Sequence, residues 1–155
     1  MEVKVTLTRD QADIDQCIDL ARKLPTYFSS KAFDEMASDF RSHELYIAKN
    51  NKQLLGFISI NKKNEAVAEI SWLAVAENHH RNGIGTILID TAVRNLKEND
   101  YRLLEVKTLA RTADYEPYLR THSFYQKHGF LSIETISPFP GWGAENPCEI
   151  YIKII

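Results

Sequence analysis

Residues 69–90 read EISWLAVAENHHRNGIGTILID, and this stretch joins an apolar strand pattern to an apolar helix pattern through a polar turn with two glycines. A helix begins with backbone N–H groups that have no partner within the helix, and its aligned peptide dipoles add partial positive charge there. Gly83 and Gly85 let the backbone approach a ligand closely. The stretch therefore predicts an anion site at a helix start, beside a strand edge along which a long, phosphorylated ligand could hydrogen-bond.

Other sites of the same general kind do not fit the residues. No third glycine completes a dinucleotide-binding fingerprint, and no Gly-Lys-Ser/Thr completes a nucleotide P-loop, so nucleotide hydrolysis is disfavoured. His79 and His80 would need further ligands at fixed spacing to hold a metal, and the other histidines do not supply them. We therefore expect no metal site.

Length and composition limit the class of protein. The chain has 155 residues, of which 44% are hydrophobic and 26% charged, which suits one globular domain over residues 1–155. A net charge of −2 without a lysine- or arginine-rich block makes nucleic acid an unlikely partner. With neither a signal-peptide core nor an apolar run long enough to span a membrane, we expect a cytoplasmic protein. Cys17 and Cys148 lack CxxC spacing and are expected to be two reduced core thiols, with a disulfide as the less favoured alternative.

Alternating hydrophobic periods predict a series of strands and helices. Asp10 or Asp13 is expected to cap the first helix, Pro25 to end it, and Pro117 to occupy the first turn of the last helix, which stops at Gly129. The expected strands are 3–7, 44–49, 54–61, 66–76, 103–109, 130–136 and 149–155, and the expected helices are 14–21, 33–40, 84–98 and 118–127.

Two motifs and this order of elements resemble the GCN5-related N-acetyltransferases. His80-Arg81-Asn82-Gly83-Ile84-Gly85 is similar to the family's acetyl-CoA segment, in which Gln or Arg is usual at the position of His80. Ser123 to Phe130, SFYQKHGF, is similar to the family's FYxxxGF element. The resemblance implies a mixed α/β domain with a central, mostly antiparallel sheet of six to seven strands and about four helices, in the order β-α-α-β-β-β-α-β-α-β-β.

The resemblance also implies a co-substrate, acetyl-CoA, and the residues that hold it. The strand backbone would hold the pantetheine, and the turn and helix start would hold the pyrophosphate mainly through backbone N–H groups. Tyr118 stands where the family often has an Asn that helps to hold the cofactor arm, which leaves the arm's polar partner open. The expected cofactor-binding residues are Leu73, Ala74, Val75, His80, Arg81, Asn82, Gly83, Ile84, Gly85, Thr86, Tyr118 and Tyr125.

Two residues are candidates for acid–base catalysis. Transfer of an acetyl group from a thioester to an amine expels a thiolate, which the Tyr125 phenol could hydrogen-bond or protonate. The amine must also lose a proton, and Glu69 on the central strand could accept it, directly or through water. A packing role for Tyr125 beside Phe124 and an ordinary surface charge for Glu69 are the alternatives.

The acceptor is left open by the sequence. Aromatic residues are expected to wall its pocket, and acidic loop residues Asp114, Glu116 and Glu145 would favour a cationic amine, either a small molecule or a peptide. Trp142 could line this pocket or lie at a contact in a homodimer. The aromatic set is Trp72, Tyr115, Tyr118, Phe139 and Trp142, of which Trp72, on the strand, is expected to lie in the core. The main reading is an N-acetyltransferase that acts by direct attack in a ternary complex; an acyl-CoA sensor without catalysis and an interaction domain without a cofactor are the alternatives.

Overall fold

The structure is a computed structural model that describes residues 2–155, and the expected order of elements is confirmed. Two short 3₁₀ turns, η1 and η2, were not expected. The strands are β1 Lys4–Thr8, β2 Glu44–Asn50, β3 Gln53–Lys62, β4 Val67–Val75, β5 Leu103–Leu109, β6 Leu131–Ile136 and β7 Cys148–Ile154. The helices are α1 Gln11–Arg22, α2 Ser30–Ser42, α3 Ile84–Glu98 and α4 Pro117–Lys127, with η1 at Glu77–His79 and η2 at Arg111–Ala113.

All seven strands form one sheet in the order β1-β2-β3-β4-β5-β7-β6. Only β4 and β5 are parallel, and every other neighbouring pair is antiparallel. A parallel pair needs a long crossover, and α3 supplies it between β4 and β5. The sheet is therefore mixed but mostly antiparallel, as the sequence predicted.

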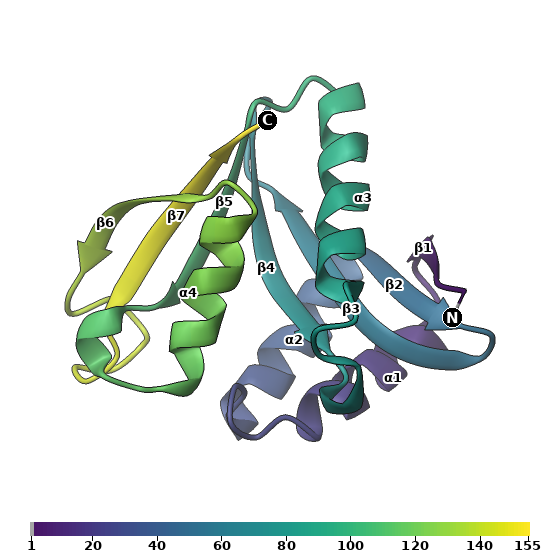
Figure 1. Ribbon diagram of the computed structural model, residues 1–155, viewed down its shortest axis with the longest axis horizontal. Coiled ribbons are helices and arrows are strands. Elements are labelled where there is room, and N and C mark those ends of the chain that lie inside the picture. Colours follow the sequence, from purple (N-terminus) through teal and green to yellow (C-terminus); the bar gives the residue numbers. More distant parts are fainter. Residues whose placement is uncertain (1) are drawn as a thin grey trace.

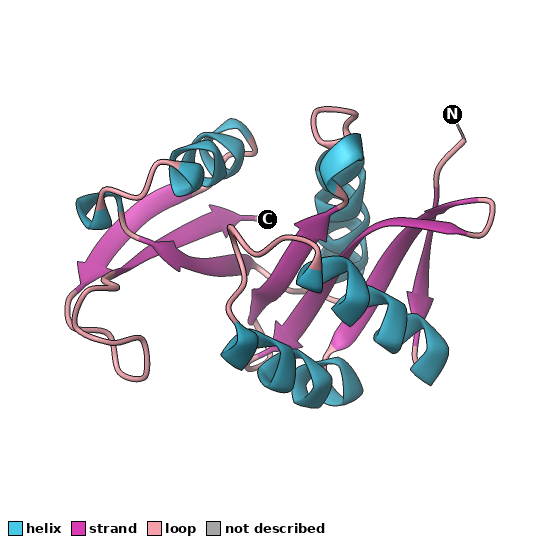
Figure 2. Cartoon of the chain, turned by 90° about the horizontal axis from the view of Figure 1, so that it is seen from below, coloured by secondary structure: helices cyan, strands magenta, loops and turns pink. Residues whose placement is uncertain are grey.

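Helices cover both faces of the sheet. Figure 2 shows α3 and α4 on one face and α1 and α2 on the other, and Figure 1 shows β5, β7 and β6 diverging from the rest of the sheet. Two groups of buried apolar side chains match the two faces. One contains Ile84, Leu88 and Tyr125 from α3 and α4, and the other contains Cys17 and Met36 from α1 and α2.

Local sequence signals account for the start of α1 and for both ends of α4. The Asp10 side chain accepts a hydrogen bond from Ala12 N at 3.1 Å and caps α1, whereas Asp13 accepts one from the Thr8 hydroxyl at 2.6 Å. Pro117 occupies the first turn of α4, and Gly129 follows that helix with a φ of 85° that favours glycine.

Both cysteines are buried free thiols, which confirms the expectation for Cys17 and Cys148. Within residues 2–155, no helix combines the length and the apolar character needed to cross a membrane.

Candidate functional site

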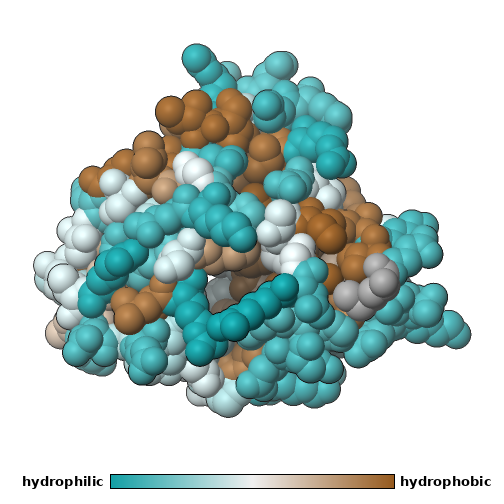
Figure 3. Space-filling view, in the orientation of Figure 1, coloured by the Kyte–Doolittle hydropathy of each residue, from teal (hydrophilic) through white to brown (hydrophobic). Residues whose placement is uncertain are grey.

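The central cleft forms where the two parallel strands part. β4 and β5 are paired only from Val67–Leu103 to Ile70–Val106, although both strands continue beyond those residues. A cleft of about 1530 Å³ opens there between the sheet, the start of α3, α4 and the segment that joins α1 to α2. Figure 3 shows a hollow at this place, with hydrophilic residues along its rim and apolar residues inside. The cleft is large enough for an extended ligand.

The backbone of β4 presents hydrogen-bonding groups to this cleft. Ala76 N donates to the Leu55 carbonyl of β3 at 2.8 Å. Backbone groups alternate between the two edges of a strand, so the N–H and C=O groups of Leu73 and Val75 point away from β3 and toward the gap. Those of Ala74 point toward β3. Of the three predicted strand residues, Leu73 and Val75 therefore direct their backbone groups to the cleft side, and Ala74 does not.

The turn after β4 leads to a helix start with free donors. Arg81 and Gly83 both have left-handed φ angles, of 69° and 79°, which bend the chain into α3. The first hydrogen bond along the helix axis runs from Ile87 N to the Gly83 carbonyl at 3.1 Å. No side chain within residues 2–155 caps this end of α3, so the N–H groups of its first turn point at the cleft without an intrahelical partner. This arrangement suits a phosphate or pyrophosphate.

His80 holds the turn against the strand. Its Nε2 lies 2.7 Å from the Val75 carbonyl oxygen, which fixes Nε2 as the donor. The expected cofactor residues all line the cleft except Asn82, whose N–H donates to the His79 carbonyl at 3.3 Å. His80 therefore braces the loop against β4.

Gly85 allows α3 and α4 to approach each other closely. A Cβ atom at this position would lie 2.9 Å from Cζ of Phe124 on α4, which is too close for unstrained packing. Phe124 also packs against Tyr125 and His128, with ring centroids 5.4 Å and 4.6 Å away. The glycine therefore sets the position of an aromatic ring that lines the cleft.

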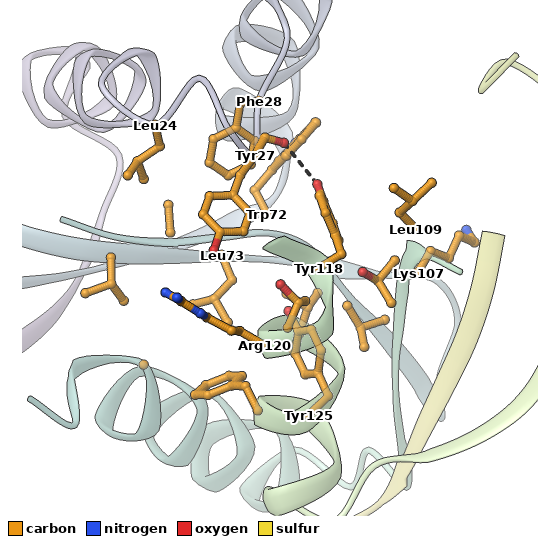
Figure 4. A pocket seen from close by; sticks show the side chains of 18 of the residues that line it. Leu24, Tyr27, Phe28, Trp72, Leu73, Lys107, Leu109, Tyr118, Arg120 and Tyr125 are labelled. Atoms are coloured by element: carbon orange, nitrogen blue, oxygen red, sulfur yellow. Dashed lines mark hydrogen bonds between the residues drawn. The ribbon is translucent and has the colours of Figure 1, made fainter. Parts of the chain in front are cut away.

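Helix α4 forms one wall of the cleft and carries both predicted tyrosines. The Tyr118 hydroxyl donates to the Tyr27 carbonyl at 3.0 Å and ties α4 to the segment after α1 (Figure 4). Behind the helix, the fully buried His122 bonds the Leu109 carbonyl through Nε2 at 2.8 Å and the Tyr151 hydroxyl through Nδ1 at 2.7 Å. These bonds fix α4 relative to β5.

Tyr125 is 5% exposed and lines the cleft. Burial, with a smaller effect from the nearby Tyr118 phenol, raises the pKa of Tyr125 well above its usual value of 10. The phenol therefore keeps its proton at neutral pH and can act as a hydrogen-bond donor.

Glu69 faces the other side of the sheet, where it pairs with a lysine of β5. Its Oε2 lies 2.8 Å from Lys107 Nζ, and both side chains are largely buried. Burial lowers the pKa of Lys107, but the Glu69 and Glu105 carboxylates outweigh it, so that the net shift is upward. Lys107 thus stays charged at neutral pH, and of the two only Glu69 can accept a proton.

A β-bulge in β4 re-aims the residues after Ile70. Opposite β3, Ile60 pairs with Ile70 and Ser59 with Trp72, so Ser71 is the extra residue. Both Ser71 and Trp72 consequently contact residues of α2 or its end: the Ser71 hydroxyl lies 3.0 Å from His43 Nδ1, and Trp72 Nε1 donates to Asp39 at 2.8 Å. Trp72 lines the cleft rather than lying wholly in the core.

The acids that line the cleft differ from those expected. Asp114, Glu116 and Glu145 do not reach it; Asp114 lies in an exposed turn with a φ of 53°. Glu35 and Asp39 line it instead, one turn apart on α2. The hydrophobic periodicity of the α2 sequence did not indicate which face of the helix would lie toward the cleft.

The aromatic expectation is correct in part. Trp72, Tyr118 and Trp142 line the cleft, whereas Tyr115 and Phe139 stand behind lining residues, with ring centroids 5.8 Å from Tyr118 and 5.0 Å from Trp142. The loop that carries Trp142 is joined to α2 by a hydrogen bond from Lys31 Nζ to the Gly141 carbonyl at 3.3 Å.

Sequence reasoning missed two cations of α4 that line the cleft. Arg120 and Lys127 are seven residues apart, so they share a helix face, and Arg120 reaches into the cavity toward the side on which Leu73 lies (Figure 4). This spacing was readable in the sequence. Among residues 2–155, no group of three or more His, Cys, Asp or Glu side chains is arranged to hold a metal ion.

Comparisons with known proteins agree with this architecture. The family model described as "Acetyltransferase (GNAT) family" matches residues 14–130. Streptothricin acetyltransferase A of Bacillus subtilis (strain 168) is 30% identical over 125 residues, which cover 74% of this chain and 66% of that protein, just under two thirds of its length.

Two solved structures share the fold. A GNAT-family protein from Desulfovibrio desulfuricans superimposes with a TM-score of 0.87 at 18% identity, over 99% of each chain. A GNAT family acetyltransferase from Elizabethkingia anophelis with acetyl-CoA bound gives a TM-score of 0.70 at 20% identity, over 99% of this chain and 98% of that one.

Proposed function

Because this chain belongs to the acetyltransferase (GNAT) family, we propose that it transfers the acetyl group of acetyl-CoA to a primary amine by direct attack in a ternary complex. Acetyl-CoA supplies the acetyl group as a thioester, whose carbonyl carbon accepts the amine. The observation that carries the proposal is the continuous path from the free edge of β4 at Leu73 and Val75 to the uncapped start of α3. An extended arm that ends in a pyrophosphate fits such a path.

Each part of this path has a proposed task. Leu73 and Val75 would bond the pantetheine amides as a neighbouring strand would, with the Val75 carbonyl shared with His80. The N–H groups of Ile84, Gly85 and Thr86 would hold the pyrophosphate. Arg120 and Lys127, on the cleft side of α4, would neutralise phosphate charge.

Tyr125 would stabilise the leaving thiolate. A free thiol has a pKa of about 8.5, and an ordinary phenol one of about 10, so complete proton transfer costs about 2 kcal/mol even before burial. The raised pKa of Tyr125 makes full transfer harder still. We therefore assign Tyr125 mainly to hydrogen bonding of the developing negative charge on sulfur.

Glu69 would take the proton that the amine loses, directly or through a water molecule. As the nitrogen–carbon bond forms and the carbon–sulfur bond breaks, one proton leaves the amine for Glu69 and the electron pair leaves with the sulfur. Lys107, paired with Glu69 at 2.8 Å, would keep the carboxylate in place.

The two cysteines argue against an acetylated enzyme. Cys17 and Cys148 are both buried, and neither lines the cleft. Burial raises the pKa of Cys17 to about 12 and that of Cys148 to about 11, so both stay protonated and are weak nucleophiles. Direct transfer to the amine needs neither.

The acceptor end of the cleft favours a cationic amine. Glu35 and Asp39 of α2 and Glu69 of β4 line the cleft together with Lys31 and Lys107, whereas Arg120 and Lys127 of α4 also line it and are assigned to the phosphates. Phe28 and Trp72 form an edge-to-face pair there, with centroids 6.1 Å apart, and their rings can receive the body of an organic cation. We propose a small-molecule amine with a second positive charge, and peptide amines are the alternative. Streptothricin, which the curated relative is named for, belongs in the first panel of acceptors.

The experiment is a measurement of CoA release from acetyl-CoA with a panel of amines. Amine-dependent release supports the transferase, and acetyl-CoA binding without release on any amine supports the other candidate, a non-catalytic acyl-CoA sensor. One observation favours the sensor: the Tyr118 hydroxyl, at the position where the family often has Asn, is already bonded to the Tyr27 carbonyl.

A further inference from the structure

Thr108 of β5 carries a hydroxyl that no group within residues 2–155 satisfies. The residue is 4% exposed, and its Oγ1 is buried without a hydrogen-bond partner among the residues described. Thr108 is nevertheless one of the residues that line the central cleft. A buried hydroxyl without a partner destabilises the folded protein, so such a group calls for an explanation.

The backbone around Thr108 is held firmly on both sides. Thr108 is paired with Glu149 of β7, and the next carbonyl along the chain, that of Leu109, accepts the hydrogen bond from the buried His122 at 2.8 Å. Figure 4 shows Lys107 and Leu109, its neighbours, across the cavity from Leu24 and Leu73. The hydroxyl is therefore held in a fixed place rather than on a mobile loop.

The register places Thr108 beside the point where the strands part. Ile70 and Val106 form the last parallel pair, and Thr108 lies two residues beyond Val106, just as Trp72 lies two residues beyond Ile70. Side chains two apart on a strand share a face, so Thr108 points to the same side as Val106, which packs in the group that contains Tyr125. The hydroxyl thus lies on the α4 side of the gap, at the level of the β4 bulge.

A second atom supports the assignment to a ligand. Five buried side-chain polar atoms lack partners among the described residues, and two of them belong to residues that line the cleft: Thr108 Oγ1 and His79 Nδ1. His79 lies in the turn before α3, at the end where phosphates are expected. Both unsatisfied atoms therefore belong to residues of the cleft lining, His79 in the turn before α3 and Thr108 beside the gap between β4 and β5.

We propose that the Thr108 hydroxyl hydrogen-bonds the acylated end of the pantetheine arm and positions the thioester in the gap between β4 and β5. The proposal rests on the proposed acetyl-CoA-dependent function. The hydroxyl would donate to a carbonyl oxygen of the arm, and Tyr125 on the same side would remain free to face the sulfur. The bond satisfies Thr108 only when the acylated arm is present, so it contributes to binding and to orientation for attack.

The test compares Thr108→Val, which removes the hydroxyl at nearly constant shape, with Thr108→Ser, which keeps it. Thr135→Val, on the exposed strand β6, is the matched control. For each protein, titration calorimetry gives the dissociation constant for acetyl-CoA, and thermal unfolding without ligand gives Tm. We expect Thr108→Val to keep or raise the unliganded Tm and to weaken acetyl-CoA binding about 5- to 30-fold, the value of one lost hydrogen bond.

The dissociation constant of Thr108→Ser for acetyl-CoA should lie within about 3-fold of the wild-type value. Thr135→Val should bind acetyl-CoA as the wild type does. A lower unliganded Tm for Thr108→Val would assign the hydroxyl to the fold and overturn the proposal. Unchanged acetyl-CoA binding in Thr108→Val would overturn it too. Failure of the wild type to bind acetyl-CoA would instead refute the proposed function, so the two failures are distinguishable.

Discussion

Glu69 and Lys107 meet across the two parallel strands at the centre of the sheet, with Glu69 Oε2 2.8 Å from Lys107 Nζ. Glu105 lies on the same face, 4.0 Å from the same lysine, yet only Glu69 and Lys107 line the central cleft. Glu105 is also paired with Lys63 at 2.7 Å, so of the two carboxylates only Glu69 can reach a bound amine.

This difference gives a matched pair of variants. We expect Glu69→Gln to lower kcat by about 100-fold to 10,000-fold, the usual range for loss of a general base. Glu105→Gln should lower kcat by less than about 3-fold, because its carboxylate does not face the cleft. Steady-state kinetics with one amine acceptor measures both. Equal losses in the two variants would contradict the role of Glu69.

Tyr125→Phe removes the phenol and keeps the ring. A hydrogen bond to a charged group contributes about 1.5–3 kcal/mol, so kcat should fall about 10- to 150-fold while acetyl-CoA binding changes little. The control is Tyr101→Phe. The Tyr101 ring lies away from the cleft, where Lys62 contacts it. Because burial raises the pKa of Tyr125, the wild-type activity should not decline through this group below pH 10. An alkaline loss centred below pH 9 that Tyr125→Phe abolishes would show that the pKa of Tyr125 is not raised, and an unchanged kcat in Tyr125→Phe would refute its role in the transfer.

Gly85 and Phe124 should be energetically coupled. In the wild type, Gly85→Ala places a methyl group 2.9 Å from the ring and should destabilise the protein by about 1–2 kcal/mol. In a Phe124→Ala background the same change meets no ring, and the better helix propensity of alanine should make it neutral or stabilising by up to about 1 kcal/mol. Urea unfolding of the four proteins measures this coupling. Additive effects would show that the close approach is not what requires glycine here.

Arg120 should contribute to cofactor binding through phosphate charge. Arg120→Gln is expected to weaken CoA binding about 5-fold at low salt, with a smaller effect at high salt. Arg94→Gln is the matched control, because Arg94 lies on α3 outside the central cleft. If both variants bind CoA equally at all salt concentrations, Arg120 has no such role.

We expect the free energy of unfolding at alkaline pH to depend on a second buried tyrosine, Tyr46. Burial, with the neighbouring Glu44 carboxylate, raises the pKa of Tyr46 to about 12. A phenol whose pKa is higher in the folded state contributes its full stability below pH 10 and loses it as the pH rises from 10 to 12. Between pH 9 and pH 11 the wild type should therefore lose about 1.4 kcal/mol of unfolding free energy that Tyr46→Phe does not lose.

Urea unfolding at several pH values measures this difference between the two proteins. The Tyr46 hydroxyl has no partner among the described residues, so the phenylalanine variant should cost nothing at pH 7. A constant difference from pH 7 to pH 11 would show that Tyr46 does not titrate as its burial implies.

The sequence was most informative where local chemistry fixes the backbone. The order of elements and a cap of the first helix by Asp10 or Asp13 followed from short-range rules, and the structure shows that Asp10 is the cap. The orientation of Ala74 did not, because it depends on which edge of β4 pairs with β3. The hydrophobic pattern of the β4 sequence also gives no sign of the β-bulge at Ser71. The position of Trp72 in the cleft could therefore not be predicted.

Residues that meet only through long-range register were also beyond sequence reasoning. Nothing in the sequence pairs Glu69 with Lys107 or turns Glu35 and Asp39 toward the cleft. Both facts depend on how α2 packs on the sheet and on how β4 and β5 align. The homodimer expected from Trp142 stays a prediction.

The most direct test of the central claim is the rate of CoA release from acetyl-CoA with a panel of primary amines that includes streptothricin, polyamines and a lysine peptide. We expect saturable, amine-dependent release by the wild type, with a second positive charge on the better acceptors, and strong loss in Glu69→Gln. Acetyl-CoA binding with no release above the amine-free rate on any acceptor would contradict the account and favour the sensor.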